Sequence, residues 1–308
     1  MKVKKVLVLR KRTTYQIQVE DYHEERFVKL LEEKSEIVKR VLIAHNEHLA
    51  TVEAVHGELE RQKIEYVSVA RSELIDPIKD VDLVIAVGGD GTFIDASHFL
   101  EEIPLLGVNS SRSSSYGHFC LAQSDNFPRI LEQICKSEIK TAKIMRLSLN
   151  LNGQQLHQKA LNEVLIAHTN PGATSRYILE IGGKKEEQRS SGIWISTPAG
   201  STGSLRSAGG VIQDIFDTDY QYLVREACQR PHENWHLLKG KLSRDQSIAM
   251  TSEMRLGAIF IDGPHVEYPF TLGDQLKITP SKHDLATFIN PELNSIFSHG
   301  ENLQEQNK

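Results

Sequence analysis

The chain has 308 residues, of which 39% are hydrophobic and 25% are charged, and its formal net charge at pH 7 is -5. This composition supports a packed core and excludes a chain that is disordered throughout. The negative charge argues against binding nucleic acid or an anionic membrane surface, because both need a basic surface. The length allows two ordinary domains.

The cysteines and the apolar segments indicate a cytoplasmic protein. Cys120, Cys135 and Cys228 have no C-x-x-C spacing, and an odd number cannot form a closed set of disulfides. The longest apolar runs, such as residues 83–87, are far shorter than the roughly 20 residues of a membrane helix. The apolar stretch at residues 6–9 is too short for the core of a signal peptide. We therefore expect no membrane partner.

The first 140 residues are predicted to alternate between strands and helices. Apolar runs typical of buried strands, and one alternating strand, lie at residues 6–9, 64–69, 82–87 and 104–108. Apolar residues at helical spacing lie between them, at residues 20–40, 49–59 and 92–100. The pattern predicts an α/β, Rossmann-like domain with a parallel sheet, whose ligands bind beyond the carboxyl ends of the strands.

A change of pattern near residue 140 predicts a second domain. Short β-rich runs follow one another at residues 146–151, 158–168, 177–181, 192–196 and 258–261. They predict a mostly antiparallel β domain over residues 141–275, with residues 276–308 completing the first domain. Residues 216–242 interrupt this pattern with helical character.

The segment Gly88-Gly89-Asp90-Gly91-Thr92 lies between a buried strand and a predicted helix. Its glycines allow a polyphosphate to approach the main chain, and the first N–H groups of the helix attract anions. The carboxylate of Asp90 would repel a phosphate, so it needs another task, such as holding Mg²⁺ or accepting the proton of an attacking hydroxyl. The alternative is an Asp-Gly turn in which Asp90 only caps the helix. The position between strand and helix favours phosphate chemistry.

A second segment, residues 196–210, is rich in small and hydroxyl-bearing residues. Such a surface suits a flat ring, and its hydroxyls suit riboses or a pyrophosphate. An ordinary loop has the same composition. Similarly, Asn162 and Glu163 are either polar residues at a strand edge or ligands of ribose hydroxyls and base edges.

Resemblance to a known family decides among these alternatives. The loop from Gly88 to Thr92 resembles a superfamily that includes NAD kinases, diacylglycerol-type lipid kinases and 6-phosphofructokinases. Segments that resemble NAD kinases alone follow in family order: G-V-N at 107–109, the Asn162-Glu163 pair, S-T-P-A-G-S-T-G-S-L-R-S-A-G-G at 196–210 and I-D-G at 261–263. The similarity covers roughly residues 81–263. The G-T-x-N-D-F segment expected of lipid kinases is not found.

The resemblance implies transfer of the γ-phosphoryl group of ATP to the adenosine ribose 2′-hydroxyl of NAD⁺ or NADH, in a cleft between the two domains. Mg²⁺ arrives with ATP, so we expect no metal site built by the protein alone; inorganic polyphosphate is an alternative donor. Asp90 is the expected catalytic base, and the expected phosphate ligands are Gly88, Gly89, Gly91 and Thr92. The expected dinucleotide-binding residues are Asp90, Gly91, Asn162, Glu163, Arg176, Arg189, Ser191, Thr202, Gly203, Ser204 and Ser207. The family also implies a homodimer or homotetramer.

Three departures from the family pattern bear on the substrate. Ser191 replaces the aspartate of an Arg-x-Asp-Gly segment, Gly203-Ser204 replaces Ala-Tyr, and a long serine-rich stretch at 110–118 replaces G-R-L-G-F-L. Together they resemble plant-type NADH kinases. NAD⁺ carries one more positive charge than NADH, so the loss of a carboxylate predicts a preference for NADH. The alternatives are a lipid or sugar kinase of the same superfamily and a non-catalytic dinucleotide sensor.

Overall fold

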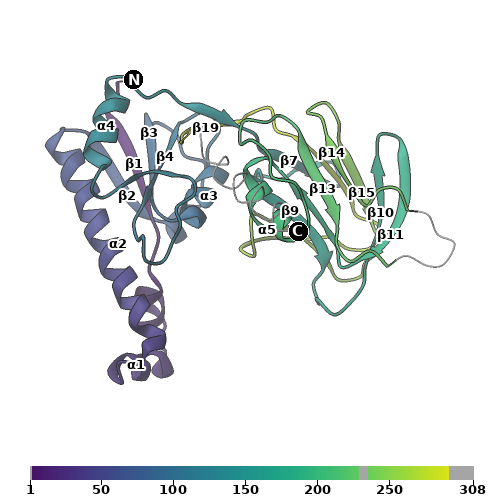
Figure 1. Cartoon of the computed structure of the whole chain (residues 1–308), viewed down its shortest axis with the longest axis horizontal. Helices are drawn as coiled ribbons and strands as arrows, with labels where there is room; N and C mark the ends of the chain where they lie inside the picture. The colour runs from purple at the N-terminus through teal and green to yellow at the C-terminus, as the bar shows by residue number, and fades with distance from the viewer. Residues whose placement is uncertain (1, 229–234, 291–308) are drawn as a thin grey trace, which may run out of the picture. The chain divides into compact units, whose positions relative to one another are not determined.

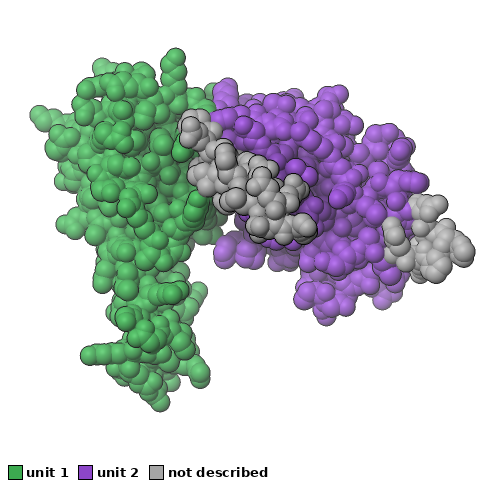
Figure 2. Space-filling model, in the orientation of Figure 1, with its two compact units in different colours: residues 1–142, 285–293 green, residues 143–284, 294–308 purple. Residues whose placement is uncertain are grey.

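The computed structural model describes residues 2–228 and 235–290, which fold into two compact units (Figure 1). Of the described residues, the first unit comprises 2–142 and 285–290, and the second comprises 143–228 and 235–284 (Figure 2). The boundary between the two units therefore falls near residue 142, and the segment that begins at residue 285 belongs again to the first unit.

The first unit contains a sheet in the order β2-β1-β3-β4-β19-β6, with β5 also paired to β4. The strands are β1 (Lys5–Arg10), β2 (Glu65–Ala70), β3 (Leu83–Gly88), β4 (Leu105–Asn109), β5 (Cys120–Gln123), β6 (Ala142–Ile144) and β19 (Leu285–Phe288). The ladders that join β1 to β2 and β3, and β4 to β3, β5 and β19, are all parallel. The predicted α/β class is confirmed. All six residues of β3 are buried, as its unbroken apolar run requires.

Three helices pack on this sheet: α2 (Glu36–Arg61), α3 (Asp90–His98) and α4 (Phe127–Cys135). The unit also contains the π-helix η1 (Gln16–Asp21), the short helix α1 (Glu25–Glu32), neither of which has a buried residue, and the 3₁₀ turn η2 (Arg71–Glu73). Val55 of α2 and Leu131 of α4 belong to the same apolar cluster as Val8 and Ile85 of the sheet.

The prediction of two helices at residues 20–40 and 49–59 is wrong in one respect. The break between the two helices lies earlier in the chain than predicted, between α1 and α2. Lys34 has a left-handed backbone with φ of 51°, which ends the short helix α1. Ser35 then caps α2, because its hydroxyl accepts a hydrogen bond from the Ile37 N–H at 3.4 Å. Helix α2 continues without interruption to Arg61.

The second unit contains two antiparallel sheets, ordered β11-β10-β15-β18-β7-β8 and β14-β13-β12-β9-β16-β17. Their strands are β7 (Leu147–Leu151), β8 (Gln154–Gln155), β9 (Glu163–His168), β10 (Ser175–Ile181), β11 (Lys184–Ser190), β12 (Ile193–Ser196), β13 (Tyr220–Val224), β14 (Lys239–Leu242), β15 (Ile248–Ser252), β16 (Gly257–Ile261), β17 (Val266–Pro269) and β18 (Gln275–Pro280). Both sheets contribute side chains to one apolar cluster, including Leu149 and Leu179 from one sheet and Ile166 and Ile195 from the other. The predicted antiparallel β domain is confirmed.

Two sequence predictions fail in this unit. Residues 216–242 are not helical where described: they form β13 and β14, and all five residues of β13 are buried, so the strand lacks the alternation that would have revealed it. Residues 276–284 do not complete the first domain, because β18 pairs with β15 and β7, and the chain returns to the first sheet only at β19. The rest of that predicted segment, 291–308, lies outside the described residues.

No helix within residues 2–228 or 235–290 is long and apolar enough to cross a membrane.

Candidate active site

The glycine loop connects β3 to α3: Gly88 is the last residue of the strand and Asp90 the first of the helix. A Cβ atom at Gly88 would lie 2.1 Å from the Thr92 hydroxyl, and one at Gly89 would lie 2.3 Å from the Ser115 hydroxyl. These two glycines are therefore required by packing inside the protein. Gly91 differs, because nothing lies within 4 Å of the Cβ it lacks. The space beside Gly91 is therefore not filled by any other part of the protein that the structure describes.

The Asp90 carboxylate is held at one oxygen only. Its Oδ1 accepts a hydrogen bond from the Phe119 N–H at 2.8 Å, and no described residue donates a hydrogen bond to its Oδ2. Burial and, to a smaller degree, the negative charge of Asp90 raise the pKa of the neighbouring Cys120 thiol, which keeps that thiol neutral. A carboxylate with one oxygen oriented by a hydrogen bond, and the other without a donor among the described residues, is arranged to accept a proton from a hydroxyl placed beside it.

The serine-rich loop that follows β4 is folded onto the glycine loop. The Asn109 side-chain N–H₂ donates to the carbonyls of Ser115 and Tyr116 at 3.1 and 3.3 Å. The Ser110 N–H donates to the Gly88 carbonyl at 2.8 Å. The asparagine of the G-V-N segment is therefore a structural residue: it sets the loop so that Ser115 lies against Gly89.

In the second unit, Asp262 fixes the main chain at Asn162 and Glu163. Its Oδ2 accepts from the Leu161 N–H at 2.7 Å, and its Oδ1 accepts from the N–H groups of Asn162 at 2.8 Å and Glu163 at 3.0 Å. The Asp262 N–H in turn donates to the Glu163 carbonyl at 2.9 Å. A carboxylate bonded to several N–H groups holds a short segment rigidly.

The side chains of this pair have unmet hydrogen-bonding capacity. Asn162 Oδ1 and Glu163 Oε2 are buried and have no hydrogen-bond partner among the described residues. Burial and, to a smaller degree, the Asp262 charge raise the pKa of Glu163 to about 8. Buried polar atoms without partners are costly, so their presence side by side indicates a site for a polar ligand.

Residues 196–210, the segment rich in small residues, form a surface beside the Asn162-Glu163 pair, which we call the wall. The Thr197 N–H donates to the Asn162 carbonyl at 2.9 Å, and a Cβ at Gly200 would lie 2.3 Å from the same oxygen. A Cβ at Gly203 would lie 3.8 Å from Glu163 Oε2. The two sequence motifs of this unit, which are more than 30 residues apart, therefore meet in one surface.

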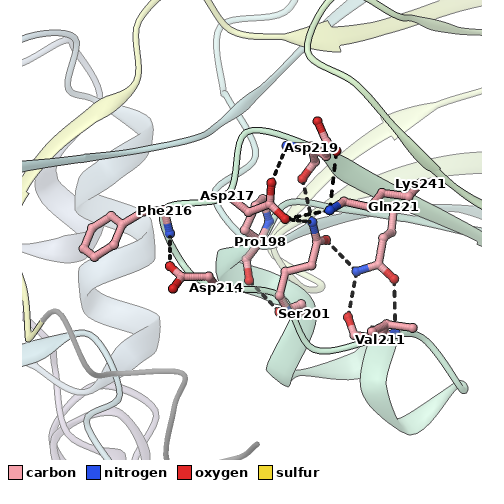
Figure 3. Close-up of polar contacts among 10 residues, drawn as sticks. Pro198, Ser201, Val211, Asp214, Phe216, Asp217, Asp219, Gln221 and Lys241 are labelled. Atoms are coloured by element: carbon pink, nitrogen blue, oxygen red, sulfur yellow. Dashed lines mark hydrogen bonds and ion pairs between the residues drawn. The ribbon is translucent and has the colours of Figure 1, made fainter.

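The far side of the wall is anchored by a polar network (Figure 3). The Ser201 hydroxyl donates to the Pro198 carbonyl at 2.6 Å and accepts from the Gln213 N–H at 3.0 Å. Gln213 also donates to Asp217, which forms an ion pair with Lys241 at 2.7 Å. A cavity of about 490 Å³ opens beside this network. Residues 213–217 thus stabilise the turn from Ala199 to Thr202, which is η3.

Three predicted ligands lie elsewhere in the unit. Arg176 and Arg189 are directly paired across β10 and β11, and Ser191 follows β11. Strand β12 separates them from the pair: Ile193 lies opposite Ile166, whereas Ser196 lies opposite Glu163. At about 3.3 Å per residue, Ile193, which follows Ser191 by two residues, is roughly 10 Å along the strand from the Glu163 end. Within one chain these residues are not brought to the Asn162-Glu163 surface.

Three further predicted ligands, Thr202, Ser204 and Ser207, belong to the segment that forms the wall. Thr202 ends η3 and is half-buried, while Ser204 and Ser207 begin and end the single turn α5 (Ser204–Ser207) and are exposed. Their hydroxyls are accessible from solvent. Thr92, by contrast, is buried against Gly88.

A glycine loop that carries an aspartate at the carboxyl end of a parallel strand suits a phosphate-transferring enzyme. Residues 3–139 match the family described as "ATP-NAD kinase N-terminal domain". The chain is 37% identical over 254 residues to the probable NADH kinase of Oryza sativa subsp. japonica, covering 75% of this chain and 78% of the relative. It is 36% identical over 272 residues to the NADH kinase of Arabidopsis thaliana, covering 79% and 81%. The chain therefore belongs to the NAD kinase family.

Solved structures share its fold. A crystal structure of an NAD kinase from Archaeoglobus fulgidus in complex with ATP has a TM-score of 0.66 at 20% identity, covering 94% of this chain and 96% of that one. The structure of yeast NADH kinase complexed with NADH has a TM-score of 0.73 at 15% identity, covering 99% and 88%.

Sequence reasoning missed several residues that build these sites. The roles of Asp262 and Asn109 are examples: both were recognised only as parts of family-like segments. Ser115 was noted only as part of an unusual serine-rich stretch. The signal for Asp262 was its place before a glycine in an Asp-Gly turn, where its φ is 53°, but nothing local indicated its bonds to residues about 100 positions away.

Proposed function

We propose that this enzyme transfers the γ-phosphoryl group of ATP to the 2′-hydroxyl of the adenosine ribose of NADH or NAD⁺. The observation that carries the proposal is the Asp90 carboxylate, oriented by the Phe119 N–H with Oδ2 unoccupied, directly beside the open space at Gly91. Membership of the NAD kinase family and similarity to plant NADH kinases support the same substrates.

The reaction needs one proton acceptor and a site for phosphate. The ribose 2′-oxygen forms a bond to the γ-phosphorus, the bond from that phosphorus to the β,γ-bridging oxygen breaks, and ADP leaves with the electron pair. Asp90 Oδ2 receives the hydroxyl proton late in the transfer. The N–H groups at the start of α3, beginning after Gly89, face the phosphates. Mg²⁺ arrives bound to ATP and neutralises their charge.

The dinucleotide binds at the Asn162-Glu163 pair. Asn162 Oδ1 and Glu163 Oε2, which have no partner among the described residues, accept hydrogen bonds from ribose hydroxyls or the adenine amino group. Gly203 leaves room above the carboxylate, and Thr202, Ser204 and Ser207 supply hydroxyls nearby.

Residues Arg176, Arg189 and Ser191 suggest an oligomer. Ser191 precedes the end of β12 that is far from Glu163, and Arg176 and Arg189 lie on β10 and β11 of the other sheet. We therefore propose that these residues serve the site of a second copy, in a homodimer or homotetramer. The serine at position 191 favours NADH over NAD⁺, because it removes a carboxylate that would attract the extra positive charge. We further propose a cytoplasmic location, which the absence of C-x-x-C spacing among Cys120, Cys135 and Cys228 supports.

Family membership speaks against a lipid or sugar kinase, and Asp90 speaks against a non-catalytic sensor. The substitution Asp90→Asn tests both points. It should lower kcat by about 10²–10⁴-fold, the usual contribution of a general base, while the affinity for NADH changes little. The exposed Asp76→Asn is the matched control. Near-native turnover by Asp90→Asn would overturn the assignment of the base.

A further inference from the structure

The cavity of about 490 Å³ beside the polar network of Figure 3 lies wholly within the second unit. Residues 209–217 line one side of it, and strands β13 and β14 line the other. Its volume falls within the roughly 300–1,000 Å³ of pockets that bind small molecules. None of the predicted dinucleotide-binding residues is among its described lining residues. The cavity is therefore a candidate site for a further ligand.

The apolar part of the cavity lies on the outer face of β13. Val224 belongs to the apolar cluster between the two sheets, so its neighbour Leu223 points to the opposite face. Leu223 is nonetheless buried, and it lines the cavity. Val211 also lines it, with a fixed main chain: the Gln221 side chain donates to the Val211 carbonyl at 2.7 Å and accepts from the Val211 N–H at 3.0 Å. Because the Val211 side chain is 69% exposed, a rigid apolar surface remains for a ligand to cover.

Two opposite charges line the cavity without an ion pair among the described residues, namely Lys239 and Asp214. Lys239 lies directly opposite Leu223 in the ladder between β13 and β14, so the two side chains share the outer face. Asp214 lies on the other side, where its Oδ1 accepts from the Phe216 N–H at 2.8 Å (Figure 3). The other two charged lining residues pair with each other in the network. One positive and one negative charge thus remain for a ligand.

We propose that this cavity binds an apolar α-amino acid. The ammonium group of the ligand, which only donates hydrogen bonds, pairs with Asp214, and its carboxylate, which only accepts them, pairs with Lys239. The apolar side chain of the ligand packs against Leu223 and Val211 and removes their surface from water. The site is additional to the kinase site and does not depend on the phosphoryl transfer.

The experiment measures binding of L-leucine to the full-length protein by calorimetry, together with two analogues. The compound 4-methylpentanoate lacks only the ammonium group of leucine, and 3-methylbutylamine lacks only its carboxylate. Each analogue should bind about fivefold more weakly than leucine, which corresponds to the contribution of up to about 1 kcal/mol from one exposed ion pair.

Substitutions assign each charge of the ligand to its partner. Asp214→Asn keeps an oxygen for the Phe216 N–H and removes only the charge, so this variant should bind leucine and 4-methylpentanoate equally. Lys239→Gln should likewise bind leucine and 3-methylbutylamine equally. Lys184→Gln is the matched control, because Lys184 is exposed at the start of β11 and is not among the described lining residues. It should bind leucine as the wild type does.

Val211→Trp tests the cavity itself. The larger side chain starts from an exposed position and fills the cavity, so leucine binding should be lost while thermal unfolding shows an intact fold. Absence of leucine binding by the wild type would overturn the proposal, as would unchanged leucine affinity in Asp214→Asn and Lys239→Gln. Binding of either analogue as tightly as leucine would replace the amino acid by a ligand with a single charge. Since no assay here uses ATP, these outcomes are independent of the kinase reaction.

Discussion

Asp262 forms two hydrogen bonds with the main chain of Glu163: its side-chain Oδ1 accepts from the Glu163 N–H at 3.0 Å, and its own N–H donates to the Glu163 carbonyl at 2.9 Å. The same carboxylate also binds the N–H groups of Leu161 and Asn162. Asp262 is thus a positioning residue, which acts on the dinucleotide through the pair it fixes. Its negative charge also helps to raise the pKa of Glu163.

Replacing Asp262 by Asn should weaken NADH binding more than it destabilises the fold. The amide keeps one acceptor oxygen where the carboxylate has two, so at least one N–H loses its partner, at a cost of about 1–3 kcal/mol. We expect a rise in KM for NADH of about tenfold or more with a smaller change in kcat. Asp274→Asn is the control, since Asp274 accepts similar bonds from Thr271 in another turn. Equal KM values for the two variants would contradict a positioning role.

The space at Gly91 predicts a substitution that separates fold from function. Gly91→Ala adds a Cβ that meets nothing in the protein, and alanine in a helix is more stable than glycine by about 0.5–1 kcal/mol. The variant should unfold at an equal or higher temperature, yet lose most kinase activity, because the methyl group occupies substrate space. Gly57→Ala, near the carboxyl end of α2 and also without neighbours within 4 Å of the missing Cβ, should be stabilised and fully active. Full activity of Gly91→Ala would show that no substrate approaches there.

The raised pKa of Glu163 predicts how stability depends on pH. With a folded pKa of about 8 and an unfolded value of 4.5, the folded protein keeps a proton that the unfolded chain loses. The free energy of unfolding therefore falls as pH rises from 4.5 to 8, by at most about 5 kcal/mol. Glu163→Gln removes this loss, so its Tm should exceed that of the wild type increasingly from pH 5 to pH 8.5. A Tm difference that is constant over this range would refute the raised pKa.

The nature of residue 191 predicts the redox preference. Ser191→Asp restores the carboxylate of the family pattern and should raise kcat/KM for NAD⁺ relative to NADH by about tenfold, which corresponds to 1.4 kcal/mol of added attraction. Ser191→Thr keeps the hydroxyl and should leave the ratio unchanged. Steady-state kinetics with both dinucleotides measure this ratio of kcat/KM values. An unchanged ratio in Ser191→Asp would show that residue 191 does not set the preference for NADH.

The sequence predicted those parts of the fold that have a local cause. Strand β3 was recognisable because its apolar run ends at two glycines, and the wall at 196–210 because small residues and hydroxyls alternate there. Strand β13 was not, since Tyr220 and Tyr222 are buried together with the residues between and beside them, and such a run has no period of two. Nor can spacing predict which distant residue bonds to Asn162, because Asp262 reaches it only through the pairing of β9 with β16.

The most direct test measures initial rates of phosphorylated dinucleotide formation by the wild-type enzyme with ATP, Mg²⁺ and either NADH or NAD⁺, with Asp90→Asn as the inactive reference. The structure and family predict that NADPH and NADP⁺ form, that kcat/KM is higher for NADH, and that Asp90→Asn loses the activity. Failure of the folded wild-type protein to form either product would contradict the proposed function.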